Sequence, residues 1–271
     1  MIRPYGTEKS QYGELHLPDG DGPFPVVVMI HGGWWAAMWD DAPVRPLIAD
    51  LVADGHAVWS IEYRRVGEPG GGWPGTFEDV TKAVDLVADL DPRLDTSRVA
   101  VVGHSAGGHL ATWTAHRRDT KLRGVVSLAG VLDLVAADTA ELGRELADLD
   151  AEPPRGAPEP SAPEMFPVVA AGVGHGMVRL MLGASAVEDP ELYQRTSPVE
   201  MGAPRVPVLA IHGSADEIVP AEFSSTYARR ATGKGGDAEF VESPGADHFH
   251  VIEPDGHAWS VARKWLQDKL S

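Results

Sequence analysis

Short apolar runs alternate with amphipathic stretches along most of the chain. The apolar runs are continuous and rich in valine and isoleucine, which is typical of strands buried on both faces. They cover residues 26–30, 57–61, 98–102, 125–128, 206–211 and 239–241. Between them, apolar side chains recur at helical spacing near 44–53, 76–87, 106–115 and 257–270. This order predicts an α/β fold with a mostly parallel, doubly wound sheet that carries helices on both faces.

The stretch 135–190 interrupts this alternation, because no strand is predicted within it. Its segment 152–167 is dense in proline and would make a poor helix, whereas 174–182 has the pattern of a short helix. A long insertion near the edge where ligands bind is often a lid. We therefore expect a single domain over 1–271 with a cap or lid insertion over 135–190, partly helical and partly irregular. A disordered surface excursion is the alternative for the proline-rich part.

Composition narrows the classes of partner. The chain has 271 residues, 43% of them apolar, which is ample for a core, and a formal net charge of −17. That charge repels nucleic acid and anionic lipid, so we expect neither as a partner. There is no cysteine, which removes disulfides and thiolate metal sites. Neither an apolar signal segment nor a run approaching the ~20 residues of a membrane span is visible, so we expect a cytoplasmic protein.

The first chemical motif is Gly-His-Ser-Ala-Gly at 103–107, between a predicted strand and a predicted helix. In the pattern G-x-S-x-G the serine sits on a tight strand-to-helix turn, and the flanking glycines leave room for that turn. Ligands of parallel sheets bind beyond the carboxyl ends of the strands, where this turn would lie. Ser105 is therefore the candidate nucleophile.

A second motif, His-Gly-Gly-Trp-Trp at 31–35, follows the first predicted strand. Acyl transfer needs donors for the developing oxyanion, and backbone N–H groups of a glycine-rich loop can supply them. We expect the N–H groups of Gly33 and Trp34 to do so, joined by that of Ala106, which follows the nucleophile. His31 is expected to brace the loop rather than to react.

A third motif, His-Gly-Ser-Ala-Asp, follows the fifth predicted strand and ends at Asp216. A carboxylate at this place can orient the imidazole of a catalytic histidine and stabilise its protonated form. The neighbouring Glu217 would point in another direction, and Asp133, after the fourth strand, is the runner-up. The alternative is that Asp216 only caps the helix expected after Pro220.

The last motif, at 245–250, reads Gly-Ala-Asp-His-Phe-His and follows the final predicted strand. A general base must take the serine proton and later return it to the leaving group, which histidine can do near neutral pH. His248 lies closer to the apex of this loop than His250 and is the preferred base.

The remaining candidates concern the pocket and metals. We expect Trp35, His104, Trp73 and Phe249 to contribute to the substrate pocket, although the tryptophans are equally compatible with the core. The carboxylates near 85–91 and 141–148 lack histidines at metal-ligand spacing, so we expect solvated helix faces, no metal site and no cofactor.

Together these motifs resemble α/β-hydrolases of the esterase and lipase type with an HGGxW oxyanion loop, which include kynurenine formamidases (arylformamidases) and carboxylesterases. The segments that carry the resemblance are 31–35, 61–64, 77–80, 103–108, 212–216 and 247–249. The resemblance covers most of the chain outside 135–190. It implies the α/β-hydrolase fold and a triad of Ser105, Asp216 and His248, in the Ser…Asp…His order of that fold. The family often has asparagine where this chain has Glu62, a departure that concerns the choice of substrate.

These features predict a serine hydrolase that cleaves a carboxylic ester or a small amide of a small molecule through an acyl-enzyme. Carboxylesterase and arylformamidase both stay open. An acyltransferase with the same triad is the alternative outside hydrolysis. A peptidase is disfavoured because its usual form in this fold carries a large additional domain, and a binding protein is disfavoured because no triad member is missing. The oligomeric state is open, with a homodimer as one option.

Overall fold

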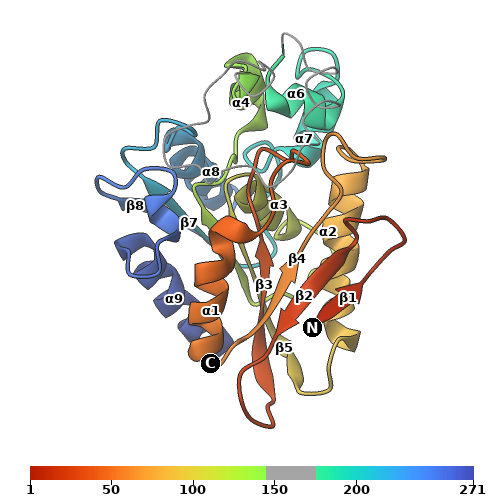
Figure 1. Cartoon of the computed structure of the whole chain (residues 1–271). Coiled ribbons are helices and arrows are strands. Elements are labelled where there is room, and N and C mark those ends of the chain that lie inside the picture. Colours follow the sequence, from red (N-terminus) through yellow and green to blue (C-terminus); the bar gives the residue numbers. More distant parts are fainter. Residues whose placement is uncertain (145–174) are drawn as a thin grey trace.

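A computed structural model describes residues 1–144 and 175–271, and within these ranges eight strands form one sheet (Figure 1). The strand order is β1-β2-β4-β3-β5-β6-β7-β8. Neighbours from β4 to β8 are parallel, whereas β1 and β2 run antiparallel at one edge. The strands are β1 (Ile2–Pro4), β2 (Tyr12–His16), β3 (Phe24–Ile30), β4 (Ala57–Ile61), β5 (Leu94–His104), β6 (Gly124–Leu128), β7 (Val208–Gly213) and β8 (Ala238–Ser243).

The parallel part of the sheet confirms the predicted fold class. Each of the six predicted strands is present as one of β3 to β8, and β5 begins four residues earlier than the apolar run suggested. The antiparallel strands β1 and β2 were not predicted. β1 has three exposed residues, and β2 alternates buried and half-buried positions, so neither has the continuous apolar run that marks a central strand.

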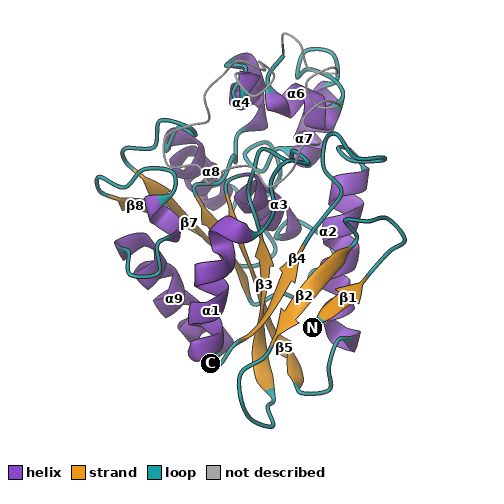
Figure 2. Cartoon of the chain, viewed as in Figure 1, coloured by secondary structure: helices purple, strands orange, loops and turns teal. Residues whose placement is uncertain are grey.

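Helices cover both faces of the sheet (Figure 2). Against one face lie α1 (Arg45–Ala53) and α9 (His257–Leu270), and against the other lie α2 (Gly75–Asp85), α3 (Ala106–Thr114) and α8 (Glu222–Gly233). Short 3-10 helices are η1 (Ala42–Val44), η2 (Leu86–Asp89) and η4 (His250–Ile252). This doubly wound arrangement leaves the carboxyl ends of the strands free for loops.

The alternation of side chains along each strand builds two cores. In β3, Val26, Val28 and Ile30 pack with α2 and α3, whereas Val27 and Met29 pack with α1 and α9. All five side chains are fully buried. A central strand must therefore be apolar at every position, because successive residues point to opposite faces and both faces are covered.

Three further helices gather beyond the carboxyl ends of the central strands, at the top of Figure 1. They are α4 (Leu134–Thr139), α6 (Met177–Leu182) and α7 (Pro190–Thr196). The short helix predicted over 174–182 corresponds to α6, while the proline-rich segment 152–167 lies outside the described residues. Among the described residues, no helix combines the length and the apolar content needed to cross a bilayer.

Candidate active site

Ser105 lies on a strained turn between β5 and α3. Its backbone has φ 55° and ψ −119°, a region that residues with a side chain rarely adopt. A Cβ at Gly103 would lie 2.1 Å from the carbonyl oxygen of Gly107, and a Cβ at Gly107 would lie 2.1 Å from that of Ile30. Glycine at both positions lets the turn close, and the result is the strand–turn–helix geometry expected of G-x-S-x-G.

Asp216 and His248 come together from two different loops. Nδ1 of His248 lies 2.7 Å from Oδ2 of Asp216 and donates to it. The other carboxylate oxygen accepts the backbone N–H groups of Ile218 (2.9 Å) and Val219 (2.8 Å). Burial opposes ionisation of Asp216, but the hydrogen bonds from neighbouring histidines outweigh it and hold its pKa well below 3.8. A buried, ionised acid therefore faces the imidazole.

His104 supports the loop that carries His248. Its Nε2 lies 2.9 Å from the backbone carbonyl oxygen of His248 and donates to it, and the two rings are 4.8 Å apart. Burial, with a smaller contribution from the charge of His248, lowers the pKa of His104 to about 3. His104 is consequently a neutral donor at neutral pH and holds the backbone of the candidate base in place.

Three consecutive residues of the loop 31–35 have left-handed backbone conformations. Gly33, Trp34 and Trp35 have φ values of 101°, 52° and 55°. At Gly33 a Cβ would lie 2.3 Å from Cβ of Trp39, so only glycine fits there. The segment after β4 holds the loop from behind, since the N–H of Val66 donates to the carbonyl of Trp35 at 2.7 Å. The candidate oxyanion donors thus sit on a braced loop.

His31 and Glu62 form part of that brace. Tyr63 donates its hydroxyl to the carbonyl of His31 at 3.0 Å. Oε2 of Glu62 lies 3.4 Å from Nε2 of His31 and 2.8 Å from Nη1 of Arg65, and all three side chains are buried. Burial opposes ionisation of Glu62, but the charges of His31 and Arg65 prevail and lower its pKa. Glu62 therefore contacts the back of the loop.

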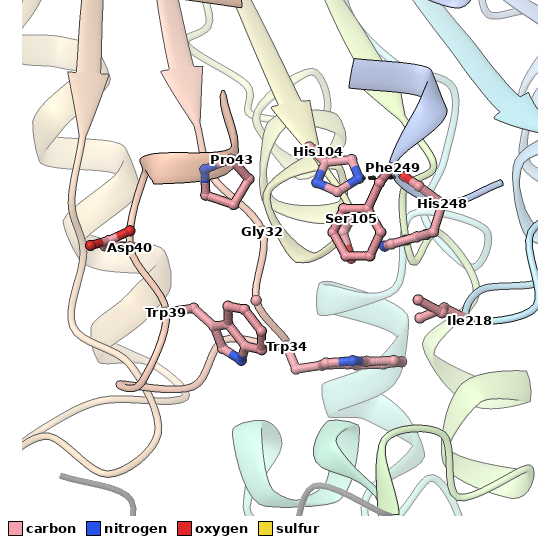
Figure 3. A pocket seen from close by; sticks show the side chains of 11 residues that line it. Gly32, Trp34, Trp39, Asp40, Pro43, His104, Ser105, Ile218, His248 and Phe249 are labelled. Atoms are coloured by element: carbon pink, nitrogen blue, oxygen red, sulfur yellow. Dashed lines mark hydrogen bonds between the residues drawn. The ribbon is translucent and has the colours of Figure 1, made fainter. Parts of the chain in front are cut away.

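A pocket opens next to Ser105, which forms part of its lining. Figure 3 shows His104, Ser105, His248 and Phe249 gathered on one side and the indole of Trp34 on the other. The full lining is Gly32, Gly33, Trp34, Trp39, Asp40, Pro43, His104, Ser105, Ile218, His248 and Phe249. The nucleophile candidate, the base candidate and part of the candidate oxyanion loop thus share one cavity.

For Trp35 and Trp73 the structure corrects the predicted pocket. Trp35 is fully buried in the core and packs edge-on against His109, with ring centroids 5.3 Å apart. Trp73 packs against Phe77 and lines a separate groove between α2 and α3. Consecutive loop residues direct their side chains differently, so Trp34 lines the pocket while Trp35 enters the core.

The runners-up for acid and base lie in other environments. Asp133 caps α4, where its side chain accepts the N–H of Ala136 at 3.0 Å. The half-exposed His250 pairs with Asp247 at 2.9 Å. The geometry therefore favours Asp216 and His248, as the sequence predicted.

Trp39, Pro43 and Ile218 line the pocket but were not singled out from the sequence. They belong to no spaced motif, and apolar side chains in a loop carry no chemical signature. His212 belongs to the third sequence motif, but the sequence predicted no role for it. Its ring nevertheless lies 3.0 Å from the carboxylate of Asp216. Nearness in space, which the sequence does not encode locally, identifies these residues.

Comparisons with known proteins agree with this architecture. A family model described as BD-FAE matches residues 14–148. The chain is 27% identical over 261 residues to esterase LipC of Mycobacterium tuberculosis, covering 87% of this chain and 57% of LipC. The chain spans about half the length of the curated relatives it matches.

Two solved structures illustrate the shared fold. An acetyl ester-xyloside bifunctional hydrolase from Caldicellulosiruptor lactoaceticus has a TM-score of 0.73 and 18% identity, covering 99% of this chain and 96% of that one. Esterase 2 of Thermogutta terrifontis, phosphorylated by paraoxon, has a TM-score of 0.69 and 18% identity, covering 99% and 93%. Both confirm the fold predicted from the sequence.

Proposed function

We propose that this chain, an α/β-hydrolase of the esterase and lipase type, hydrolyses carboxylic esters through an acyl-enzyme formed on Ser105. The observation that carries the proposal is the hydrogen bond between Asp216 and His248. His248 lines the same pocket as Ser105, which lies on a strained turn. Two curated relatives, LipC and LipQ of Mycobacterium tuberculosis, are named esterases, and these names support the same reaction.

The proposed mechanism assigns one role to each group. His248 takes the hydroxyl proton of Ser105 as the serine oxygen attacks the ester carbonyl. Asp216 stabilises the imidazolium that forms, and the backbone N–H groups of Gly33, Trp34 and Ala106 stabilise the oxyanion. His248 then protonates the departing alcohol. Water, activated by the same imidazole, attacks the acyl-enzyme and releases the carboxylic acid.

The pocket and the overall charge support an uncharged, partly apolar ester as substrate. The side chains of Trp34, Trp39, Pro43, Ile218 and Phe249 give the cavity a largely apolar wall. A net charge of −17 disfavours the approach of anionic esters.

The decisive experiment combines labelling with turnover. Paraoxon should phosphorylate the wild-type protein once, and peptide mass spectrometry should locate the adduct on Ser105. The variant Ser105→Ala should lose both labelling and hydrolysis of p-nitrophenyl acetate while keeping its circular dichroism spectrum. Ser127→Ala is the matched control, because Ser127 is a buried serine on the neighbouring strand β6. Turnover by Ser105→Ala at the wild-type rate would refute the proposal.

The finer substrate alternatives are tested with the same protein. The relatives' names favour an ester over an aryl formamide, so we propose that kcat/KM is higher for p-nitrophenyl acetate than for N-formylkynurenine. Acyl transfer would appear as an acylated alcohol when a competing alcohol is added, whereas hydrolysis gives the free acid. We further propose that 135–190 acts as a cap on a single domain. A cytoplasmic location stays a prediction from the sequence.

A further inference from the structure

His212 is the penultimate residue of β7 and lies fully buried behind the candidate acid, and the proposed mechanism gives it no role. Its Nε2 lies 3.0 Å from Oδ2 of Asp216 and 2.9 Å from the carbonyl oxygen of Val219. Its Nδ1 lies 2.7 Å from the hydroxyl oxygen of Ser224 on α8. Both ring nitrogens of a buried imidazole are therefore engaged, and one of them contacts the carboxylate oxygen that also receives His248.

The contacts fix which nitrogen carries the proton. A carboxylate and a carbonyl oxygen can only accept, so Nε2 of His212 must be the donor. The hydroxyl of Ser224 can donate, and it completes the ring by donating to Nδ1. The Nε2–H of His212 is then shared between Asp216 and Val219.

We infer that His212 is a positioning residue that sets both the orientation and the charge of Asp216 for the base. The inference rests on the proposed function of Ser105. Two backbone N–H groups hold Oδ1 of Asp216, and His212 holds Oδ2. The carboxylate therefore cannot rotate away from His248. A hydrogen bond to Oδ2 also disperses its negative charge, which weakens its stabilisation of a protonated His248.

This charge effect gives the inference a pH signature. Without the His212 donor the carboxylate holds the imidazolium more strongly, so the base stays protonated up to a higher pH. The acid limb of the pH–rate profile, where kcat falls as the base becomes protonated, should therefore move to higher pH. A merely structural defect would lower kcat and leave this limb in place.

Four other titratable groups surround the pair, and the two with resolved shifts keep a constant charge across the assay range. Those that face it from the surrounding elements are His104, Asp247, Asp40 on the pocket wall, and His250 beyond Asp247. His104 has a pKa of about 3 because it is buried, so it stays neutral between about pH 5 and pH 8. Burial opposes ionisation of Asp247, but backbone N–H groups prevail and lower its pKa, so its charge is constant in that range.

The test compares His212→Phe, which removes the donor at similar volume, with His212→Gln, which keeps an N–H at similar reach. With p-nitrophenyl acetate as probe, His212→Phe should lower kcat by about 10- to 100-fold, the usual effect of removing a donor to a charged group, with KM unchanged. Its acid limb should move up by roughly half a pH unit. His212→Gln should recover most of kcat and return the limb to its wild-type position.

Ser224→Ala provides a second route if His212→Phe does not fold. Without the hydroxyl on Nδ1 the imidazole is a weaker donor, so kcat should fall several-fold and the acid limb should move in the same direction. His56→Phe is the matched control, since His56 is a buried histidine at the opposite end of the sheet, before β4, and should keep the wild-type profile.

The outcomes separate the inference from the proposed function. The inference is overturned if His212→Phe keeps the wild-type kcat and an unmoved acid limb. If His212→Phe does not fold, the same result in Ser224→Ala overturns it. A fall in kcat that His212→Gln does not rescue, with the limb unmoved, would overturn it too. Ser105→Ala, assayed in parallel, tests the proposed function by itself. If it keeps full turnover, the acyl-enzyme proposal fails whatever the His212 variants do.

Discussion

Gly107 is the point where α3 meets the end of β3, and a single added methyl group there should damage both stability and activity. A Cβ at this position would lie 2.1 Å from the carbonyl oxygen of Ile30 and 2.4 Å from that of His31. Both contacts are with backbone, so no flexible side chain can move aside. Carbon–oxygen contacts of this kind normally lie near ~3.3 Å, so Gly107→Ala must push the strand end and the helix apart by about 1 Å.

Gly107→Ala should lower the free energy of unfolding, although alanine forms helices better than glycine does. Alanine gains up to about 1 kcal/mol over glycine inside a helix. Inserting a carbon into a packed site costs typically ~1–3 kcal/mol, and the backbone contacts place this site at the upper end or beyond. A net loss of about 2 kcal/mol should lower Tm by roughly 4–8 °C in a chain of this size.

Activity should fall more steeply than stability. His31 begins the candidate oxyanion loop and Ser105 precedes α3, so the same separation moves the proposed oxyanion donors away from the proposed nucleophile. A misplacement of ~1 Å can cost about 100-fold in rate. We expect kcat for p-nitrophenyl acetate to fall by about that factor.

Differential scanning fluorimetry and steady-state kinetics check both effects. Gly233→Ala is the matched control, because Gly233 ends α8 and a Cβ there meets nothing within 4 Å. It should match the wild type or be slightly more stable. The reasoning is refuted if Gly107→Ala melts within about 2 °C of the control and retains kcat within about threefold.

Three further predictions concern buried polar groups. Asp216→Asn keeps the shape but loses the charge that orients His248, so kcat should fall by about 10⁴-fold with KM little changed; steady-state kinetics showing a loss under tenfold would contradict this role. His109 has a pKa lowered by burial to about 4, so its unfolded form binds the proton first and stability is lost as pH falls from 6.5 toward 4. Urea unfolding of His109→Gln should show a smaller difference between these pH values, and an unchanged difference would refute the assignment. Asp79 is fully buried and accepts hydrogen bonds from Nε and Nη2 of Arg64 at 2.8 and 2.7 Å. Asp79→Asn should therefore lower the free energy of unfolding by ~3 kcal/mol. A loss below about 1 kcal/mol, measured by urea unfolding, would contradict the importance of this pair.

Prediction from the sequence succeeded where the signal is a local pattern of residues. Continuous apolar runs predicted the parallel strands, since a strand covered on both faces must be apolar at every position. Glycines two residues on either side of Ser105 predicted the elbow, because only glycine tolerates the backbone approach there. The preference for His248 over His250 also followed from position in the loop, and the geometry agrees with it.

Prediction failed where the environment of a side chain comes from distant segments. Trp34 and Trp35 are chemically alike and adjacent, yet one lines the pocket and the other lies in the core. Their sequence holds no signal for this difference, because it depends on positive φ values in the loop and on His109, contributed by α3. The strands β1 and β2 were missed for a related reason. The pairing of β2 with β4 and of β1 with β2, rather than an apolar pattern of their own, places them in the sheet.

The sequence by itself therefore determined the fold class and the chemical type of each candidate catalytic group, because these follow from periodicity and from residues at fixed spacing. Only the tertiary structure decided which side chains share the cavity, that Glu62 contacts His31 at the back of the candidate oxyanion loop, and that His212 shares the carboxylate of Asp216 with His248. Hydrogen bonds and burial depend on distances of a few ångströms between segments far apart in the chain, and folding alone fixes those distances.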